Sequence, residues 1–293
     1  MKNYILITGG AGFIGTNLIK ILLKKTSFRI ISLDNYSTGV KRNHIKNKKV
    51  KYLKGDTRDI SRILNKYKNK IHSTFHFGEF SRIYQSFKYF NECLNSNLIG
   101  TKEVFNFCFI NKIKIIYSAT SASLGNNGND KDLSPYAFTK AKNLELLVNL
   151  KKWFNYKYEV IYFYNVYGNH QIETGEMATV VGIFEKAFKD NTYLPVVKPG
   201  TQTRRFTHVD DTVNACFYAW KKNKNLHYSI LSKDSISIIE LAKLFKKKIK
   251  YLKPRKGERF ASAIINKNLS NNIQKIYSIT KIRDYVASFI SNN

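Results

Sequence analysis

The fold of this chain is decided by residues 4–15, which read Tyr-Ile-Leu-Ile-Thr-Gly-Gly-Ala-Gly-Phe-Ile-Gly. The apolar run predicts a buried strand, and the glycines predict a tight turn into a helix. The first glycine allows the turn, the third lets the backbone approach a pyrophosphate, and the last lets the helix pack on the sheet. Helix N-termini bind phosphate groups. We therefore predict a dinucleotide site that includes Gly9, Gly12, Phe13, Ile14 and Gly15.

A second predicted strand ends in a carboxylate. It runs from Arg29 to Asp34, and Asp34 lies about 20 residues past the glycines. At that spacing an acidic side chain binds the hydroxyls of the adenosine ribose and repels a 2′-phosphate. Asp34 and its neighbour Asn35 therefore predict NAD as the cofactor, although Lys41 and Arg42 lie close enough in the sequence to weaken the preference over NADP.

The chain of 293 residues has an ordinary hydrophobic content of 43% but a formal net charge of +30. A strongly basic protein can bind nucleic acid through phosphate contacts. Here the lysines and arginines are spread along the chain instead of gathered in arms, so we expect no nucleic-acid partner. The positive field would instead attract a small anionic substrate.

Several other classes of protein are disfavoured by the sequence. No apolar stretch has the length of a signal peptide or a membrane-spanning helix, so we expect a cytoplasmic protein without a membrane partner. Cys93, Cys108 and Cys216 are widely separated and form no Cys-x-x-Cys pair, and no set of His, Asp and Glu has metal-ligand spacing. We therefore expect neither a disulfide framework nor a metal.

Strand-like and helical segments alternate along the first half of the chain. Further strands are predicted at residues 50–54, 72–77, 114–118 and 159–163, and long helices from about Ser86 to Asn111 and from Tyr136 to Asn155. This alternation predicts an α/β fold with a doubly wound parallel sheet of the Rossmann type. We assign residues 1–168 to an NAD-binding domain and 169–293 to a smaller C-terminal substrate-binding lobe, with a soft boundary across which segments can interdigitate.

Tyr136 and Lys140 lie four residues apart at the start of a predicted helix, so both side chains share one face. A phenol is a poor base at neutral pH, but an adjacent ammonium favours the phenolate. The hydroxyl-rich segment from Ser118 to Gly125 follows a predicted strand, at the sheet edge where doubly wound folds bind ligands. These residues together indicate acid/base chemistry beside a dinucleotide.

In combination these segments resemble the extended short-chain dehydrogenases/reductases, specifically the NAD-dependent nucleotide-sugar epimerases and dehydratases, with UDP-glucose 4-epimerases the nearest in pattern. The likeness covers nearly the whole chain. The matching segments are residues 8–15, 34–35, 55–59, 97–101, 118–125, 135–136 with Lys140, 164–168 and 204–211.

The resemblance implies roles for individual residues. Thr120 is the expected catalytic hydroxyl, Tyr136 the acid/base and Lys140 the partner that also binds the cofactor ribose. Asp56 and Thr57 are expected at the adenine. Asn165, Arg204 and Arg255 are expected to contact the substrate, the two arginines on its diphosphate. As a separate hypothesis, Glu79, Ser81, Arg82 and Met177 are candidates for the lining of the sugar pocket. The resemblance also implies a homodimer built on the two long helices.

The leading interpretation is inversion of C4 in a UDP-hexose through a transient 4-keto sugar. Tyr136 takes the proton of the O4 hydroxyl, Thr120 hydrogen-bonds that oxygen, and NAD accepts the C4 hydride. The pattern around residues 34–42 is similar to the cofactor loop of UDP-galactose 4-epimerases.

Three alternatives remain open. A 4,6-dehydratase or C3/C5 epimerase needs a further acid/base; Ser121 and Ala122 stand where dehydratases carry carboxylates, but Glu79 could serve if it faces the sugar instead of pairing with Arg82. Residues 175–179 are similar to ADP-heptose 6-epimerases, although Thr174 replaces their lysine. A non-catalytic NAD sensor or scaffold is the alternative of another class.

Overall fold

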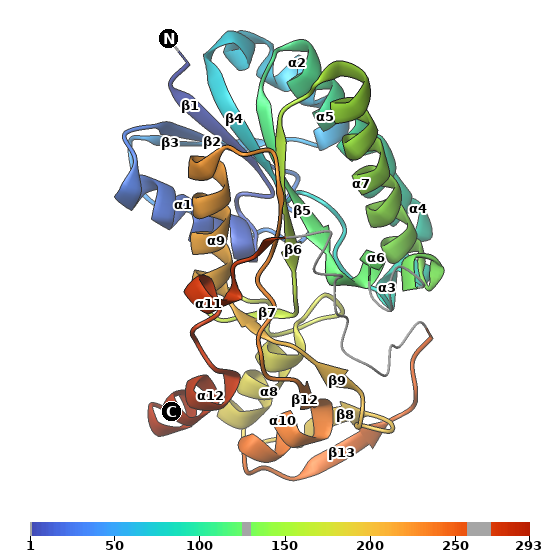
Figure 1. Cartoon of the computed structure of the whole chain (residues 1–293). Helices are drawn as coiled ribbons and strands as arrows, with labels where there is room; N and C mark the ends of the chain where they lie inside the picture. The colour runs from blue at the N-terminus through green and yellow to red at the C-terminus, as the bar shows by residue number, and fades with distance from the viewer. Residues whose placement is uncertain (1, 125–129, 257–270) are drawn as a thin grey trace.

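The computed structural model describes residues 2–124, 130–256 and 271–293; Gly125, the last residue of the hydroxyl-rich segment, lies outside them. Figure 1 shows a large lobe built on a twisted sheet and a smaller lobe beyond the carboxyl ends of its central strands. The large sheet has eight parallel strands in the described part of the chain. The predicted α/β fold with a doubly wound parallel sheet is therefore confirmed.

The strands follow the order β14-β11-β6-β5-β4-β1-β2-β3 across the sheet. Their bounds are β1 Tyr4–Thr8, β2 Arg29–Asp34, β3 Val50–Lys54, β4 Ile71–His76, β5 Lys114–Thr120, β6 Tyr158–Phe163, β11 His227–Ser229 and β14 Asn271–Asn272. The direction of winding reverses between β1 and β4. The carboxyl ends of these two strands therefore leave the crevice in which doubly wound sheets bind ligands.

Helices cover both faces of the sheet, and the strand side chains alternate between them. Leu6 enters the core on one face, while Ile5 and Ile7 enter the core on the other. One face carries α2 Ile60–Leu64, α5 Thr101–Ile110 and α7 Pro135–Phe154, and the other carries α1 Phe13–Lys25, α9 Val209–Lys222 and α11 Gln274–Tyr277 (Figure 1). Short 3-10 helices connect the early strands, at η1 Lys41–Asn43, η2 Thr57–Asp59 and η3 Asn65–Lys70.

The helical segment predicted from about Ser86 to Asn111 is present, but it is not a regular α-helix throughout. The structure has α3 Gln85–Lys88, α4 Phe90–Leu94, a π-helical stretch η4 Asn95–Gly100 and then α5. Asn97 explains the wide turn, because its side chain hydrogen-bonds both the N–H and the carbonyl of Phe80, at 2.7 and 3.1 Å. Its own carbonyl accepts a 2.7 Å hydrogen bond from the Asn143 side chain, which opens the helical ladder at that point.

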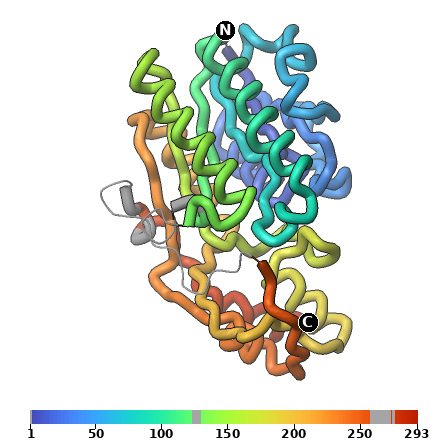
Figure 2. Tube along the Cα trace, turned by 90° about the vertical axis from the view of Figure 1, so that its right-hand side faces the viewer, coloured from blue at the N-terminus to red at the C-terminus, as the bar shows by residue number. Residues whose placement is uncertain are grey.

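The second long helix, α7, agrees with its prediction because its ends are capped locally. Ser134 accepts a hydrogen bond from the Ala137 N–H, Pro135 occupies the first turn, and Asn155 ends the helix in the left-handed conformation. Figure 2 shows α7 and α5 side by side on the outer face of the large lobe. Before α7, the strand β5 extends through Thr120, and Ser121–Leu124 form a single helical turn, α6.

The smaller lobe has its own apolar core between short sheets and helices. Its elements are α8 Val180–Lys189, β8 Leu194–Val197, β9 Thr203–Arg204, β12 Ile236–Ser237, α10 Ile238–Leu244, β13 Ile249–Leu252 and α12 Ile282–Ser291. A two-stranded pair, β7 Val166–Tyr167 with β10 Thr207–His208, joins the lobes. After Gly168 the chain returns to the large lobe in α9, β11, β14 and α11, so one cut at residue 168 does not separate the lobes.

None of the helices in the described ranges combines the length and the apolar character needed to cross a membrane.

The core of the smaller lobe predicts a sharp contrast between two aromatic truncations. Phe184 is fully buried and packs edge-to-face on Phe245 with ring centroids 5.8 Å apart, whereas Tyr193 is 58% exposed. We expect Phe184→Ala to lower the free energy of unfolding by about 3–5 kcal/mol, because it leaves a cavity. Tyr193→Ala, the control, should change it by less than about 0.5 kcal/mol. Equal effects in thermal or urea unfolding would contradict the assignment of this core.

Candidate active site

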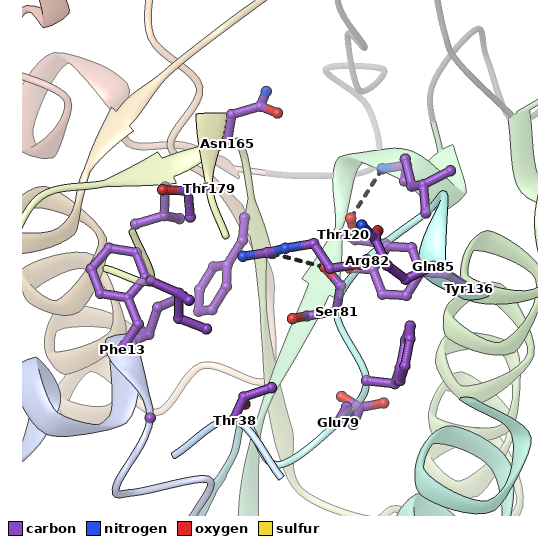
Figure 3. A pocket seen from close by; sticks show the side chains of 18 of the residues that line it. Phe13, Thr38, Glu79, Ser81, Arg82, Gln85, Thr120, Tyr136, Asn165 and Thr179 are labelled. Atoms are coloured by element: carbon purple, nitrogen blue, oxygen red, sulfur yellow. Dashed lines mark hydrogen bonds between the residues drawn. The ribbon is translucent and has the colours of Figure 1, made fainter. Parts of the chain in front are cut away.

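A cavity of about 470 Å³ lies between the lobes, at the carboxyl ends of the central strands. Both lobes contribute side chains to it (Figure 3). It contains most residues that the sequence assigned to cofactor or substrate: Gly9, Gly12, Phe13, Ile14, Gly15, Asp34, Asn35, Thr57, Glu79, Ser81, Arg82, Thr120, Tyr136, Lys140, Asn165, Arg204 and Arg255. Asp56 and Met177 are not among the described residues that line it.

The glycine-rich turn has the shape that a pyrophosphate needs. Gly9 has φ +71°, and a Cβ there would lie 2.9 Å from the backbone of Gly78. A Cβ on Gly15 would overlap the carbonyl of Gly9, so neither position accepts a larger residue. Gly12 is the N-cap of α1, and no described side chain caps that helix end. Its free N–H groups therefore face the cavity, as a bound phosphate requires.

Asp34 is held so that its oxygens can also meet ribose hydroxyls. Its two carboxylate oxygens accept hydrogen bonds from the N–H groups of Ala11 and Tyr36, at 2.9 and 2.8 Å. Each oxygen keeps a lone pair for a further donor. Burial raises the pKa of Asp34, and the two backbone N–H groups counteract part of that rise. Neither Lys41 nor Arg42 is among the described lining residues.

Asp56, one of the residues expected at the adenine, is not among the described residues that line the cavity. Thr57 lines the cavity, but the carboxylate of Asp56 accepts hydrogen bonds from the Arg58 side chain at 2.9 Å and from Asn35 at 3.3 Å. Asp56 also caps the 3-10 helix η2 through the Arg58 N–H. The structure therefore shows Asp56 organising the loop around the cavity, with Asn35 and Thr57 on the lining itself.

Tyr136 and Thr120 meet on one wall of the cavity, as Figure 3 shows. Burial raises the pKa of Tyr136 to about 12, a hydrogen bond with Thr120 lowers it, Glu79 raises it and Arg82 lowers it. The Tyr136 N–H donates to the hydroxyl of Ser86 at 3.2 Å, which anchors the start of α7. The phenol is therefore placed for proton transfer but is neutral until further positive charge arrives.

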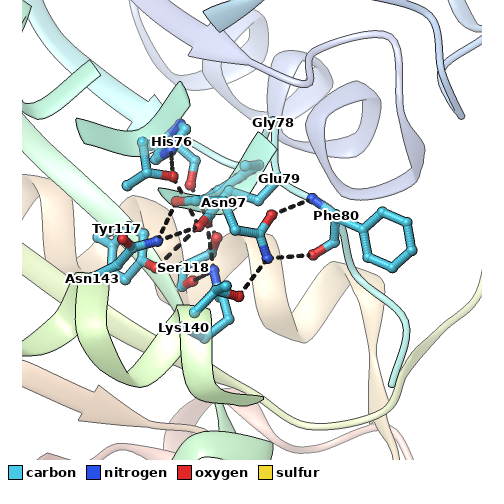
Figure 4. A network of polar contacts seen from close by, with 12 residues as sticks. His76, Gly78, Glu79, Phe80, Asn97, Tyr117, Ser118, Lys140 and Asn143 are labelled. Carbon is cyan, nitrogen blue, oxygen red and sulfur yellow. Dashed lines mark hydrogen bonds and ion pairs between the residues drawn. The ribbon is translucent and has the colours of Figure 1, made fainter. Parts of the chain in front are cut away.

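Lys140 is anchored from behind by Glu79 (Figure 4). Its Nζ lies 2.5 Å from Glu79 Oε2, and the two side chains are 4% and 3% exposed. The ammonium also donates to the carbonyl of Ser118 and lies 4.5 Å from the ring centre of Tyr117. An ammonium has three N–H donors, and its third has no acceptor among the described residues. That donor is available to a cofactor ribose.

The other carboxylate oxygen of Glu79, Oε1, accepts three hydrogen bonds. Thr101, Tyr117 and Asn143 all donate to Glu79 Oε1, at 3.0, 3.1 and 3.1 Å. His76, whose pKa burial lowers to about 4, extends the network by a 2.9 Å hydrogen bond to Thr101. The ion pair with Arg82 considered from the sequence is therefore not formed. The Glu79 carboxylate instead belongs to a closed network behind Lys140.

Arg82 lines the cavity, and hydrogen bonds to the other lobe fix its orientation. Its Nε and Nη2 both donate to the carbonyl of Met177, at 2.9 and 2.6 Å, and its Nη1 donates to the Ser81 carbonyl at 3.0 Å. Met177 thus holds Arg82 through its backbone and does not line the cavity with its side chain. The sequence assigned Met177 to the sugar because spacing alone does not tell which of its groups faces the cavity.

The smaller lobe supplies Arg204 and Arg255 to the same cavity, and Arg255 stacks over Tyr84 at 5.4 Å from the ring centre. Asn165 lines it too, and donates to the Arg205 carbonyl at 2.9 Å. The sequence missed Gln202, which also lines the cavity and whose buried Oε1 has no hydrogen-bond partner in the described part of the chain. Its spacing of two residues from Arg204 was the available signal, because alternate residues of an extended segment face the same side.

Among the described residues, no group of three or more His, Cys, Asp or Glu side chains could hold a metal ion.

Comparison with known proteins adds the family. Residues 5–231 match the sequence profile described as "NAD dependent epimerase/dehydratase family". The chain belongs to this family. NAD is thus the cofactor, and the glycine turn and Asp34 fit it without strain.

Relatives within the family catalyse different reactions. The chain is 28% identical to the ADP-L-glycero-D-manno-heptose-6-epimerase of Brachyspira hyodysenteriae, over 83% of this chain and 80% of that protein. It is 27% identical to the dTDP-D-glucose 4,6-dehydratase of Dictyostelium discoideum, over 82% and 60%. The Thermus thermophilus UDP-glucose 4-epimerase in complex with NAD has the same fold, with a TM-score of 0.84, 22% identity, and coverage of 98% of each chain.

The network behind Lys140 predicts a shift in pH dependence. The negative charge of Glu79 raises the pKa of Tyr136, so its removal in Glu79→Gln should lower that pKa. We expect the rise of kcat/KM with pH, which reports formation of the phenolate, to move to lower pH in this variant. Glu103→Gln is the control, because Glu103 pairs on the surface with Lys102. A profile that stays in place or moves to higher pH would contradict this role for Glu79.

Proposed function

We propose that the chain is an NAD-dependent nucleotide-sugar epimerase that inverts C4 of a UDP-hexose through a transient 4-keto sugar. The observation that carries the proposal is the joint position of Thr120, Tyr136 and Lys140 on the wall of one cavity that also holds a dinucleotide turn. A non-catalytic NAD sensor would not need a buried phenol with a hydroxyl and an ammonium beside it.

The chemistry starts from a carbon that does not lose its proton. A carbinol C–H is not acidic, so inversion requires transient oxidation, and NAD supplies it by taking the C4 hydride and returning it. Tyr136 removes the O4 proton as the ketone forms and restores it when the alcohol returns. Thr120, which hydrogen-bonds Tyr136, donates to the same oxygen. The ammonium of Lys140, which lines the same cavity, favours the phenolate of Tyr136. Return of the hydride to the other face gives the epimer without net redox change.

The diphosphate of the substrate is assigned to the smaller lobe. Arg204 and Arg255 line the cavity on that side, and guanidinium groups bind phosphate oxygens through paired hydrogen bonds. With the diphosphate held there, the sugar extends toward Tyr136, which lines the same cavity. This arrangement favours a nucleotide sugar over a free sugar, because most of the binding contacts lie on the nucleotide and its phosphates.

Elimination is disfavoured by the position of Glu79. A 4,6-dehydratase or a C3/C5 epimerase needs an acid/base at a second sugar carbon, but Glu79 is committed to Lys140 and three other donors. Ser121 and Ala122 follow Thr120 and supply no carboxylate. Epimerisation at C4 is the reaction that the remaining groups support.

We also propose a homodimer and a cytoplasmic location. Figure 2 turns the side of the large lobe that carries α4, η4 and α7 to the viewer. Six large apolar side chains of these helices are exposed: Phe90, Ile99, Phe138, Val148, Trp153 and Phe154. A second copy would cover them. Cys93, Cys108 and Cys216 are free and buried, which suits a reducing compartment.

Proton NMR of the protein with neutral and acidic UDP-, GDP- and ADP-sugars tests the activity. We expect an equilibrating pair of C4 epimers without added reductant. Tyr136→Phe should lower turnover about 100- to 10,000-fold and leave NAD bound, while the surface control Tyr193→Phe should not change it. A C6 methyl doublet with a 4-keto product would instead identify a dehydratase, and full activity of Tyr136→Phe would remove Tyr136 from the mechanism.

Light scattering tests the dimer. Phe138 is 39% exposed on α7, so Phe138→Glu should place a charge in the proposed interface and yield monomers. Tyr193→Glu, on the smaller lobe, should remain dimeric. A wild-type mass of one chain at micromolar concentration would contradict the homodimer.

A further inference from the structure

We infer that the sugar carries a carboxylate, as in a nucleotide-linked uronic acid, and that Arg82 binds it. This inference rests on the proposed function and narrows its substrate class. It comes from the donors that Arg82 leaves unused and from its place beside the catalytic phenol.

The hydrogen bonds of Arg82 leave one pair of donors available. A guanidinium has five N–H groups. The Nε and one N–H of Nη2 donate to the Met177 carbonyl, and one N–H of Nη1 donates to the Ser81 carbonyl. One N–H therefore remains on each terminal nitrogen, with no acceptor among the described residues. Two such N–H groups form the fork that binds both oxygens of a carboxylate.

The described residues offer Arg82 no acidic partner, although a buried charge is costly when it is unpaired. Among the described residues, the acidic side chains that line the cavity are Asp34 and Glu79. Asp34 accepts from Ala11 and Tyr36 at the ribose end, and Glu79 is paired with Lys140. Arg82 is half-buried, and its burial lowers the pKa of the guanidinium. An anionic group on the substrate would supply the missing partner.

Arg82 also lies in the part of the cavity where the sugar is expected, next to Tyr136. Its charge lowers the pKa of Tyr136, and Figure 3 shows its side chain beside Tyr136 and Thr120, reaching toward Thr179 on the other lobe. If Tyr136 meets the O4 hydroxyl, the group on C5 is the neighbouring substituent of the ring. A carboxylate at C6 is therefore within the region that Arg82 reaches. Arg204 and Arg255, which are assigned to the diphosphate, line the same cavity.

A purely structural role for Arg82 is less consistent with its surroundings. The segment that contains Met177 is already tied to α3 and α4 by Glu176, whose carboxylate binds Lys88 at 2.6 Å and Tyr89 at 2.5 Å. Gln85 adds a 2.5 Å hydrogen bond to the Glu176 carbonyl. The hydrogen bonds of Arg82 to the Met177 carbonyl therefore do more than attach this segment. They hold the guanidinium in one orientation before substrate binds.

The test compares UDP-glucuronic acid with UDP-glucose on the NAD-loaded protein, both by calorimetric binding and by kcat/KM. We expect the acidic sugar to be preferred about 10- to 100-fold, which is the effect of a charge-assisted pair of hydrogen bonds. Arg82→Met should abolish this preference. Lys88→Met is the matched control, because it removes a cation from the neighbouring contacts outside the cavity and should keep the preference.

The outcomes separate this inference from the proposed function. Equal or better use of UDP-glucose by the wild type, or an equal loss of both substrates in Arg82→Met, would overturn the carboxylate site and leave the epimerase intact. Preferential binding of the acidic sugar that depends on Arg82 supports the site even if C4 is not inverted. In that case loss of CO₂, detected as a UDP-pentose by mass spectrometry, would overturn the epimerase alone. Failure of every UDP-sugar to bind would overturn both.

Discussion

The buried ion pair between Lys140 and Glu79 is the interaction on which the rest of the site depends. The two charged atoms lie 2.5 Å apart, and both side chains are almost fully buried. Removal of one partner from such a pair costs about 3–5 kcal/mol, because the other charge is left without compensation. Glu79 follows β4, and its other oxygen is bound by Tyr117 of β5, Thr101 of α5 and Asn143 of α7. One carboxylate therefore fixes four elements around the catalytic lysine.

This arrangement balances charge around the catalytic phenol. Burial and the negative charge of Glu79 raise the pKa of Tyr136, which is about 12 without ligands. Thr120 and Arg82 act in the opposite direction. The phenol is therefore neutral until the cationic nicotinamide of NAD lies beside it, which would couple proton removal to the presence of the oxidant. In the proposed mechanism, proton transfer by Tyr136 depends on the sum of these fields rather than on the Tyr-Lys spacing alone.

The two lobes divide the recognition of ligands. The large lobe holds the dinucleotide turn, Asp34 and the catalytic residues, and the smaller lobe brings Arg204 and Arg255 to the same cavity. The contact between Arg82 and the Met177 carbonyl crosses from one lobe to the other, so it would link the proposed sugar subsite to the proposed phosphate subsite. The π-helical turn at Asn97 supports the same region, because the Asn97 side chain hydrogen-bonds the backbone of Phe80, the residue after Glu79.

The sequence by itself determined the fold and the cofactor end of the site. The apolar run before Gly9, the acidic end of β2 and the four-residue spacing of Tyr136 and Lys140 act through local geometry, which sequence periodicity and spacing report directly. The caps of α7 are local as well, so its bounds were predictable.

Only the tertiary structure decided the direction of the polar side chains between those landmarks. Glu79 turns to Lys140 and away from Arg82 because partners from β5, α5 and α7, distant in the sequence, supply its hydrogen bonds. The orientation of Arg82 is set by the carbonyl of Met177, 95 residues away. The helical segment after Ser86 contains a π-helical stretch because Asn97 binds Phe80 and Asn143. These hydrogen-bond partners depend on which groups come together in the folded chain, and the spacing of residues along the sequence does not predict that.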